Sequence, residues 1–291
     1  MHEDQVDVDI DVVRGLLAQQ RPDLAGLPIT PVASTGTVNA LFRIGDDLVA
    51  RLPLTAEWSA DIEHEWRILP RLAERITTVR VPEPEFKGEP DTTFPFTWSI
   101  YRWIKGSPYE DRFVDDEPGA ARTLARFVLE MRSLNIGDDA PPAGRDPLRD
   151  LDDLTREAIR ASHGVIDTAA ALAVWNDSLD APAWDGERVW IHTDLLRPNL
   201  LVEKGRLVAV IDFGGAGVGD PASDLTAAWA TFGSIGRRVY RAALQPDDGE
   251  WSRGRGIALH QAAMIIPYYA ESNPAFVELA RRTIEQIIDD A

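Results

Sequence analysis

The sequence predicts an α+β protein with two lobes, a β-rich N-terminal lobe followed by a mainly helical C-terminal lobe. Residues 29–54 and 97–104 are rich in short apolar runs, β-branched and aromatic side chains, which are typical of strands. From about residue 105 onward the apolar residues recur with helical spacing, and one short stretch at 200–211 interrupts them. Ligand sites tend to form in the cleft between two such lobes.

The first third of the chain alternates between helical and strand patterns. Apolar runs on either side of a Gly-Asp-Asp turn are the signal for a hairpin, and apolar residues on one helical face are the signal for a helix. The expected elements are a helix within residues 1–20, strands within 29–54 around a turn at 45–47, a helix over 61–74, a Pro-rich loop at 81–84 and a strand over 97–104.

The remainder of the chain is dominated by amphipathic helical patterns. Leu124, Phe127, Val128, Met131 and Leu134 repeat at i, i+3, i+4 and i+7, which predicts a helix with one buried face. The other expected elements are helices over 148–159 and 169–179, a short hairpin formed by 200–202 and 207–211, and further helices from residue 221 to the end.

The 291-residue chain carries a formal net charge of −18 and no cysteine. So acidic a surface repels nucleic-acid phosphates and anionic lipid, so neither partner is expected. It favours a cationic small molecule, although an acidic surface also serves solubility alone. The absence of cysteine excludes disulfides and thiolate chemistry. The acidic start does not resemble a signal peptide and no apolar run approaches the ~18 residues of a membrane span, so we expect a cytoplasmic protein without an obligate protein partner.

The strongest functional signal is a pair of motifs in the second half of the chain. The octapeptide HTDLLRPN at residues 192–199 is followed by DFG at residues 212–214. Together they match the kinase pattern H-R-D-L-x-x-x-N and D-F-G at every position except Thr193. The first pattern alone arises by chance in roughly one per cent of chains of this length. A second motif at the end of an apolar strand makes coincidence rarer still.

Phosphoryl transfer explains why these residue types occur at this spacing. The reaction needs a carboxylate that orients the attacking hydroxyl and accepts its proton, and oxygen ligands that hold Mg²⁺ on the phosphates. Asp194 and Asn199 are five positions apart in one loop, so one can face the acceptor and the other the metal. Asp212 offers a full negative charge to the same metal. The competing interpretation is that these loop carboxylates merely cap helices.

The sequence resembles the aminoglycoside phosphotransferase family, a branch of the protein-kinase-like fold, over nearly its whole length. The resemblance implies Asp194 as the catalytic base and Asn199 and Asp212 as Mg²⁺ ligands. It also implies ATP or GTP as the phosphoryl donor, and His192 as a residue that braces the catalytic loop.

The same resemblance assigns residues in the N-terminal lobe. Ser34 and Thr35 belong to a loop expected to cover the triphosphate. Arg51 occupies the position of the strand lysine that contacts the α- and β-phosphates; it keeps the charge but changes the geometry. Glu65 resembles the acidic partner of that cation, with Glu63 as the alternative.

The connection between the lobes is also implied by the resemblance. The backbone of Arg102 and Ile104 is expected to hydrogen-bond the purine, and Asp224 to bond the backbone of the catalytic loop. We expect a nucleotide-binding lobe over residues 1–104 and a catalytic and acceptor-binding lobe over residues 105–291.

The acceptor is expected to be a small molecule, because only five residues separate the DFG motif from Asp220 and leave no room for a peptide-binding segment. Family members bind their amino sugars with acidic residues. The candidates here are Asp150, Asp152, Asp153 and Glu157, which cluster on one expected helix, and Glu271 near the C-terminal helices. A solvated helix face is the competing interpretation of such a charge run.

The expected function is Mg²⁺-dependent phosphorylation of a small-molecule hydroxyl, with an aminoglycoside antibiotic as the leading acceptor and antibiotic resistance as a hypothesis for the biological role. A macrolide, or a metabolite such as a sugar or choline-like alcohol, is the alternative acceptor, because one fold serves all of them. A nucleotide-binding pseudokinase is the alternative from another class, favoured only by the arginine at position 51.

Overall fold

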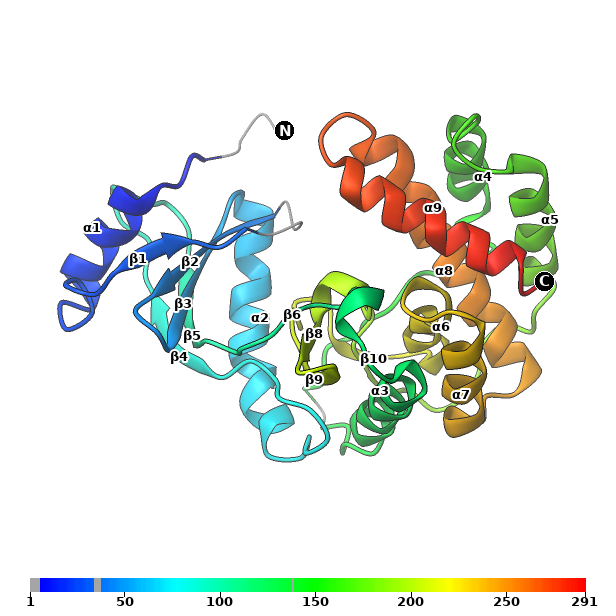
Figure 1. Ribbon diagram of the computed structural model, residues 1–291, viewed down its shortest axis with the longest axis horizontal. Helices are drawn as coiled ribbons and strands as arrows, with labels where there is room; N and C mark the ends of the chain where they lie inside the picture. The colour runs from blue at the N-terminus through cyan, green and yellow to red at the C-terminus, as the bar shows by residue number, and fades with distance from the viewer. Residues whose placement is uncertain (1–5, 34–37, 138) are drawn as a thin grey trace. The chain divides into compact units, whose positions relative to one another are not determined.

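The computed structural model describes residues 6–33, 38–137 and 139–291, and its chain divides into two compact units (Figure 1). The first unit draws on the described residues of Met1–Arg75, Arg80–Gly106 and Ile211–Gly214. The second contains Ile76–Val79, Ser107–Val210 and Gly215–Ala291. The segment Ile211–Gly214 therefore packs with residues that precede it by more than a hundred positions.

The first unit is built on one antiparallel sheet of five strands in the order β1-β2-β3-β5-β4, with α1 and α2 on either side of it (Figure 1). Its elements are α1 (Ile10–Gln20), β1 (Ile29–Pro31), β2 (Asn39–Ile44), β3 (Leu48–Pro53), α2 (Ala56–Ala73), β4 (Pro84–Gly88) and β5 (Trp98–Arg102).

Alternation along β3 and β5 gives this sheet two different faces, because successive strand residues point to opposite sides. Ala50 and Ile100 are buried in the apolar core that α1 completes with Val13, Leu16 and Leu17. Their neighbours Arg51 and Tyr101 instead contact Glu65 on α2. One face of the sheet is therefore apolar, and the other carries the charged residues of the candidate site.

The second unit is mainly helical. Its strands form a three-stranded sheet, β6-β8-β9, and the antiparallel pair β7 and β10. Its elements are β6 (Ser107–Pro108), η1 (Asp111–Phe113), α3 (Glu117–Arg132), α4 (Asp152–Ala161), α5 (Thr168–Leu179), β7 (Val189–Ile191), η2 (Arg197–Asn199), β8 (Leu200–Glu203), β9 (Arg206–Val210), β10 (Gly217–Gly219), η3 (Pro221–Thr226), α6 (Ala227–Ala230), α7 (Ser234–Leu244), α8 (Asp248–Tyr269) and α9 (Pro274–Ile288).

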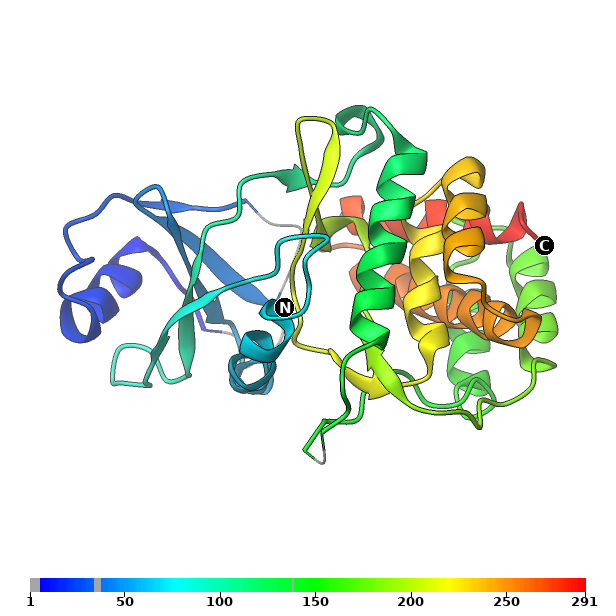
Figure 2. The same cartoon turned by 90° about the horizontal axis from the view of Figure 1, so that it is seen from below.

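Helix α8 is the central element of the second unit and packs against α4, α5, α9 and η3. Its close approach to η3 requires a glycine: a Cβ on Gly254 would lie 2.6 Å from Cβ of Leu225 and 3.0 Å from the carbonyl oxygen of Ala222. Figure 2 shows this unit from below, with the β8–β9 hairpin in yellow-green beside α3 in green.

The expected α+β class, the two hairpins and the long amphipathic helices are confirmed, with shifted ends. The helix expected over 61–74 begins at Ala56, and the helix expected over 148–159 begins at Asp152. The prediction of a Pro-rich loop over 81–84 was wrong at its last residue, because Pro84 begins strand β4 and pairs with β5. The pairing of Gly217–Gly219 with β7 was not expected, since glycines carry no strand signal. Within the described part of the chain, no helix is both long and apolar enough to cross a membrane.

Candidate active site

The expected catalytic loop, residues 192–199, follows β7 in the second unit. Thr193 has φ of 75°, a value that is unusual for a β-branched residue and that turns the chain between His192 and Asp194. The amide nitrogen of Asn199 donates to the backbone carbonyl of Asp194 at 3.0 Å and to its Oδ2 at 2.7 Å. Asp194 and Asn199, paired by the sequence motif, are thus in direct contact. Strained backbone of this kind persists only where the surroundings hold it.

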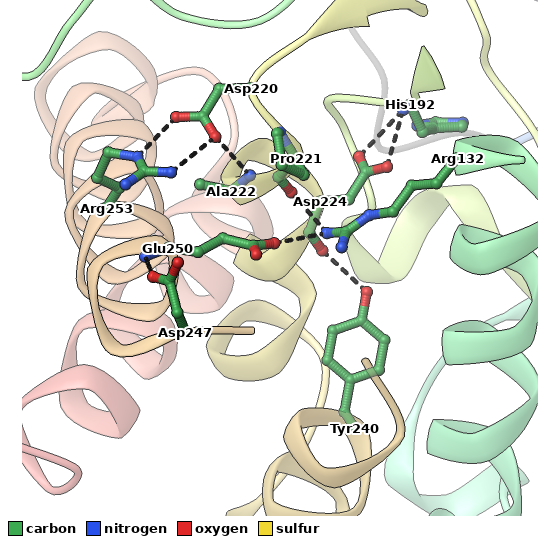
Figure 3. Close-up of polar contacts among 10 residues, drawn as sticks. All are labelled: Arg132, His192, Asp220, Pro221, Ala222, Asp224, Tyr240, Asp247, Glu250 and Arg253. Atoms are coloured by element: carbon green, nitrogen blue, oxygen red, sulfur yellow. Dashed lines mark hydrogen bonds and ion pairs between the residues drawn. The ribbon is translucent and has the colours of Figure 1, made fainter. Parts of the chain in front are cut away.

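Asp224 at the start of η3 holds this strained turn. Its buried carboxylate accepts the N–H of His192 at 3.0 Å (Figure 3). It also accepts the N–H of Thr193 at 2.9 Å. Burial raises the pKa of the Asp224 carboxyl to about 6, and the N–H groups of Thr193 and His192 and the charge of Arg132 act in the opposite direction. The hydroxyl of Tyr240 donates to the backbone carbonyl of Asp224 at 2.9 Å. The expected bond between Asp224 and the catalytic-loop backbone is present.

Two ion pairs near Asp224 join α8 to α3 and to Asp220, the residue before η3 (Figure 3). Arg132 on α3 donates to the Pro221 carbonyl and to Glu250 on α8, both at 2.9 Å. Arg253 on α8 contacts both oxygens of Asp220 at 2.8 and 3.2 Å. These side chains are mostly buried, so the pairs fix the position of α8 relative to the catalytic loop.

A second cluster lies in the first unit around Glu65, which has no exposed surface. Its carboxylate accepts Nη1 of Arg51 at 2.8 Å, the hydroxyl of Tyr101 at 2.6 Å and the N–H of Phe213 at 2.9 Å. The Arg51 guanidinium also donates to Oδ1 of Asp212 at 3.0 Å. The structure therefore brings together three residues that sequence reasoning assigned, Arg51, Glu65 and Asp212.

The alternative partner, Glu63, lies elsewhere: it forms an exposed ion pair with Lys87 at 2.9 Å. Arg51 meets a further group that the sequence did not indicate, the side-chain amide of Asn39; with the amide oriented to satisfy its neighbours, its oxygen accepts Nη2 at 3.1 Å and Nε at 3.0 Å. Burial acts to lower the pKa of Arg51, but the carboxylates of Glu65 and Asp212 outweigh it and raise that pKa above its ordinary value. The planar, forked guanidinium thus links β2, β3, α2 and the DFG motif. The compact ammonium of a lysine has no such fork and could not reach all of these groups.

The DFG segment itself is constrained. Asp212 has φ of 66°, in the left-handed region that most residues avoid. A Cβ on Gly214 would lie 3.0 Å from Cβ of Asp61, so a larger residue fits there only if the Asp61 side chain shifts. Burial raises the pKa of the Asp61 carboxyl to about 6; Arg51 lowers it, and Asp212 raises it further. Asp61 stands one helical turn before Glu65, and nothing in the motif identified it.

Arg102 and Ile104, the residues expected to bind the purine, differ in which backbone groups are available for hydrogen bonding. The N–H of Arg102 donates to the Glu83 carbonyl at 3.0 Å, so the expected purine contact at this residue is restricted to its carbonyl. The N–H and carbonyl of Ile104 make no hydrogen bond to any described residue. Of the two expected contacts, Ile104 is therefore the one with both backbone groups available to a base edge.

The metal-ligand assignment can be tested on the donor atoms themselves. The side-chain nitrogen of Asn199 makes both contacts to Asp194. Its Oδ1 accepts no hydrogen bond from the described residues. The Asp212 side chain is 39% exposed and uses one oxygen for Arg51. An amide oxygen and a carboxylate suit Mg²⁺, which takes few protein ligands and completes its shell with phosphates and waters. No group of three or more His, Cys, Asp or Glu side chains able to hold a metal occurs among the described residues. The residues present fit Mg²⁺ held largely by a nucleotide.

The remaining assigned residues are either undescribed or exposed. Ser34 and Thr35 lie outside the described residues. Asp152 is a structural residue, because its Oδ1 accepts Nε1 of Trp175 at 2.7 Å and Nε of Arg156 at 2.6 Å. The other acceptor-site candidates are exposed on or near α4 and after α8, and the structure does not bring them into contact with Asp194: Asp150, Asp153, Glu157 and Glu271.

One contact to Asp194, the expected catalytic base, was not predicted from the sequence. Nε2 of Gln261, on α8, donates to Oδ1 of Asp194 at 2.8 Å. The two residues are 67 positions apart, and a lone glutamine on an apolar helix carries no sequence signal, so only the fold reveals the contact.

Comparisons with known proteins agree with this geometry. The sequence profile of the phosphotransferase enzyme family matches residues 29–257, most of the chain, and the chain belongs to this family. It is accordingly a phosphotransferase by class, as its motifs predicted.

Solved structures share the fold at low sequence identity. The GDP and kanamycin complex of the aminoglycoside phosphotransferase APH(2")-IIIa is 17% identical, covers 96% of this chain and 98% of its own, and has a TM-score of 0.74. The macrolide 2'-phosphotransferase MphH from Brachybacterium faecium is 23% identical over 95% of this chain and 97% of its own, with a TM-score of 0.60. The protein-kinase-like fold is thereby confirmed.

One curated relative matches a part of the chain. The uncharacterized protein YcbJ of Bacillus subtilis (strain 168) is 28% identical over 189 residues, 62% of this chain and 56% of the relative. The match spans little more than half the length of that relative.

Proposed function

We propose that this protein transfers the γ-phosphoryl group of ATP or GTP to a hydroxyl of a small-molecule antibiotic, with an aminoglycoside as the leading acceptor. The observation that carries the proposal is the Asp194 carboxylate, which is held at both oxygens in a strained loop. A fixed carboxylate in a phosphotransferase has an evident use as the group that orients the attacking hydroxyl.

In the proposed reaction the hydroxyl oxygen of the acceptor bonds to the γ-phosphorus, and Asp194 accepts the proton of that hydroxyl. The bond between that phosphorus and the bridging β–γ oxygen breaks, and the nucleoside diphosphate leaves with the electron pair. Positioning and charge neutralisation supply most of the rate in such reactions. The strained turn at Thr193 and its anchor on Asp224 serve the positioning.

Asn199 and Asp212 are the residues we propose to hold Mg²⁺. When bound, the ion neutralises the charge of the phosphates and of the leaving diphosphate. The chain's own contribution is to present two hard oxygen ligands with fixed orientations, Asn199 through its bonds to Asp194 and Asp212 through its bond to Arg51.

We propose that the first unit binds the nucleotide. The backbone of Ile104 and the carbonyl of Arg102 would bond the purine, and Ser34 and Thr35 would cover the phosphates. Arg51 has two roles in this proposal: its charge faces the phosphates, and its fork keeps Glu65 and Asp212 in place.

The acceptor assignment is supported by charge and by similarity. The net charge of −18 and the exposed acids Asp150, Asp153, Glu157 and Glu271 favour a polycationic amino sugar. The similar structure APH(2")-IIIa has been solved with kanamycin. A macrolide is the second candidate, because the macrolide 2'-phosphotransferase MphH shares 23% of its residues with this chain.

The test is a coupled assay of ADP or GDP release with Mg²⁺. ATP and GTP are each offered with kanamycin, gentamicin, streptomycin, erythromycin, choline and simple sugars. We expect release that depends on an aminoglycoside. Release with erythromycin alone would replace the leading acceptor by a macrolide, and release with choline or a sugar alone would replace it by a metabolite. Tight nucleotide binding without release for any acceptor would contradict the proposal and favour the pseudokinase.

A further inference from the structure

Gln261 is a neutral side chain in contact with the residue proposed as catalytic base, yet it belongs to no motif. Its Nε2 donates to Oδ1 of Asp194 at 2.8 Å, while Nδ2 of Asn199 donates to Oδ2 at 2.7 Å. The two carboxylate oxygens are thus held by N–H donors from two different elements, α8 and η2. A carboxylate held at one oxygen can still rotate about χ2, and a second donor removes most of that freedom.

The surroundings of Gln261 direct its amide toward Asp194. Its stem borders a cavity of about 10 Å³ that is otherwise almost entirely apolar, with Leu196, Ala258, Ile265 and Leu279 in its wall. Gln261 is half-buried, and an amide placed among apolar groups loses free energy unless it finds a polar partner. The ionised carboxylate accepts only, so the amide nitrogen is the end that faces it.

Helix α8 is itself anchored on the N-terminal side of this contact. The neighbouring residue His260 bonds the hydroxyl of Thr155 on α4 through Nδ1 at 2.8 Å. Nearer the helix start, Arg253 and Glu250 form the ion pairs to Asp220 and Arg132 described above. Gln261 therefore projects from a fixed support, as a group that orients a base has to do.

We propose that Gln261 is a positioning residue for phosphoryl transfer. It acts through Asp194: it holds the carboxylate in the rotamer that meets the acceptor hydroxyl, and its own atoms touch neither nucleotide nor acceptor. The inference rests on the proposed function, because Asp194 is the base only if the protein transfers phosphoryl groups. A neutral donor suits this role, since it restrains the carboxylate without adding a positive charge beside a group that must accept a proton.

The test uses the full chain and three substitutions at one site. Gln261→Leu keeps the volume and removes the donor, and an apolar side chain is compatible with the apolar wall around it. Gln261→Glu keeps the shape but places a second carboxylate against Asp194. Gln261→Asn keeps the donor on a shorter stem. The same Leu and Glu substitutions at Gln19, an exposed residue of α1, are the matched controls.

We expect Gln261→Leu to lower kcat about 10- to 100-fold, the scale of a 1 Å misplacement of a catalytic group. KM for the acceptor and for the nucleotide should stay within about 3-fold of wild type, because the binding groups are untouched. Gln261→Glu should lose at least as much, since like charges in contact repel. Gln261→Asn should recover part of the loss, and melting temperatures and both Gln19 variants should match wild type.

The possible results separate the inference from the function beneath it. If wild type phosphorylates an acceptor and a folded Gln261→Leu has the same kcat, the positioning role is wrong. A rise in acceptor KM at constant kcat would also overturn it, because Gln261 would then contact the acceptor. If Gln261→Leu does not fold, a folded Gln261→Glu with wild-type kcat overturns it in the same way. No turnover by wild type with any acceptor would refute the proposed function and, with it, this role.

Discussion

Glu65 offers a direct measure of what holds the first unit's charged cluster together, through the substitution Glu65→Ala. The side chain has no exposed surface and accepts three hydrogen bonds, from Arg51, Tyr101 and Phe213. Its removal leaves the buried Arg51 guanidinium with Asp212 as its one charged partner, and leaves a hydroxyl and a backbone N–H without their acceptor.

The magnitude follows from these losses. Removing one partner of a buried ion pair costs about 3–5 kcal/mol, and each unsatisfied buried donor adds about 1–3 kcal/mol. Asp212 and the Asn39 amide still contact Arg51, and water entering the cavity replaces part of the hydrogen bonding, so the full sum is not reached. We expect a net loss of about 4 kcal/mol in the free energy of unfolding.

The assay is urea unfolding followed by tryptophan fluorescence and circular dichroism. With an m-value of about 2 kcal/mol/M, the expected loss moves the midpoint by about 2 M. Glu63→Ala is the matched control on the same helix: its exposed pair with Lys87 is worth about 0–1 kcal/mol. If Glu65→Ala and Glu63→Ala cost the same, the reasoning that burial and three donors make Glu65 structural is refuted.

The remaining predictions concern a metal ligand and a buried histidine. Asp212→Ala should weaken the Mg²⁺-dependent binding of ADP or GDP by about 10- to 100-fold in calorimetry, because one of two proposed protein ligands is lost; unchanged Mg²⁺ dependence would count against that role. Burial, and secondly the charge of Arg145, lower the pKa of His260 to about 4, so the folded state resists its protonation. The neutral His260 contributes fully to stability above its ordinary pKa of about 6.5, and this contribution is lost as pH falls toward 4. The loss is on the order of 2 kcal/mol and should appear as a fall in the urea midpoint across this pH range, which His260→Asn should remove. Equal slopes in wild type and variant would show that His260 does not titrate in this way.

Most of the fold could be predicted because its helices and hairpins depend on patterns among residues that are close in sequence. The apolar periodicity from Leu124 to Met131 specifies one face of α3, which ends before Leu134, and the strand runs around Lys204-Gly205 specify the β8–β9 hairpin. Pairing between distant glycine-rich segments is not written locally, so the ladder of Gly217–Gly219 with β7 could not be predicted. Its glycines permit the close approach of the 141–143 backbone, which sequence periodicity does not express.

The residues of the candidate site likewise differ in whether a local motif identifies them. Asp194 and Asn199 were predictable because both stand in one short motif, and Glu65 was predictable once the family resemblance fixed the helix that carries it. Gln261 and Asn39 were not, because each meets its charged partner through the folding of separate elements. Neutral amides also give no charge or periodicity signal that would distinguish them from solvated side chains.

The central claim is that Asp194 acts as the base in phosphoryl transfer to a small-molecule hydroxyl. The most direct measurement compares wild type and Asp194→Ala for ADP or GDP release with kanamycin and Mg²⁺, with mass spectrometry of the acceptor and calorimetry of nucleotide binding on the same samples. The account predicts that wild type adds one phosphoryl group to the acceptor, while Asp194→Ala binds nucleotide with similar affinity and adds none. Wild-type turnover by a folded Asp194→Ala would contradict it.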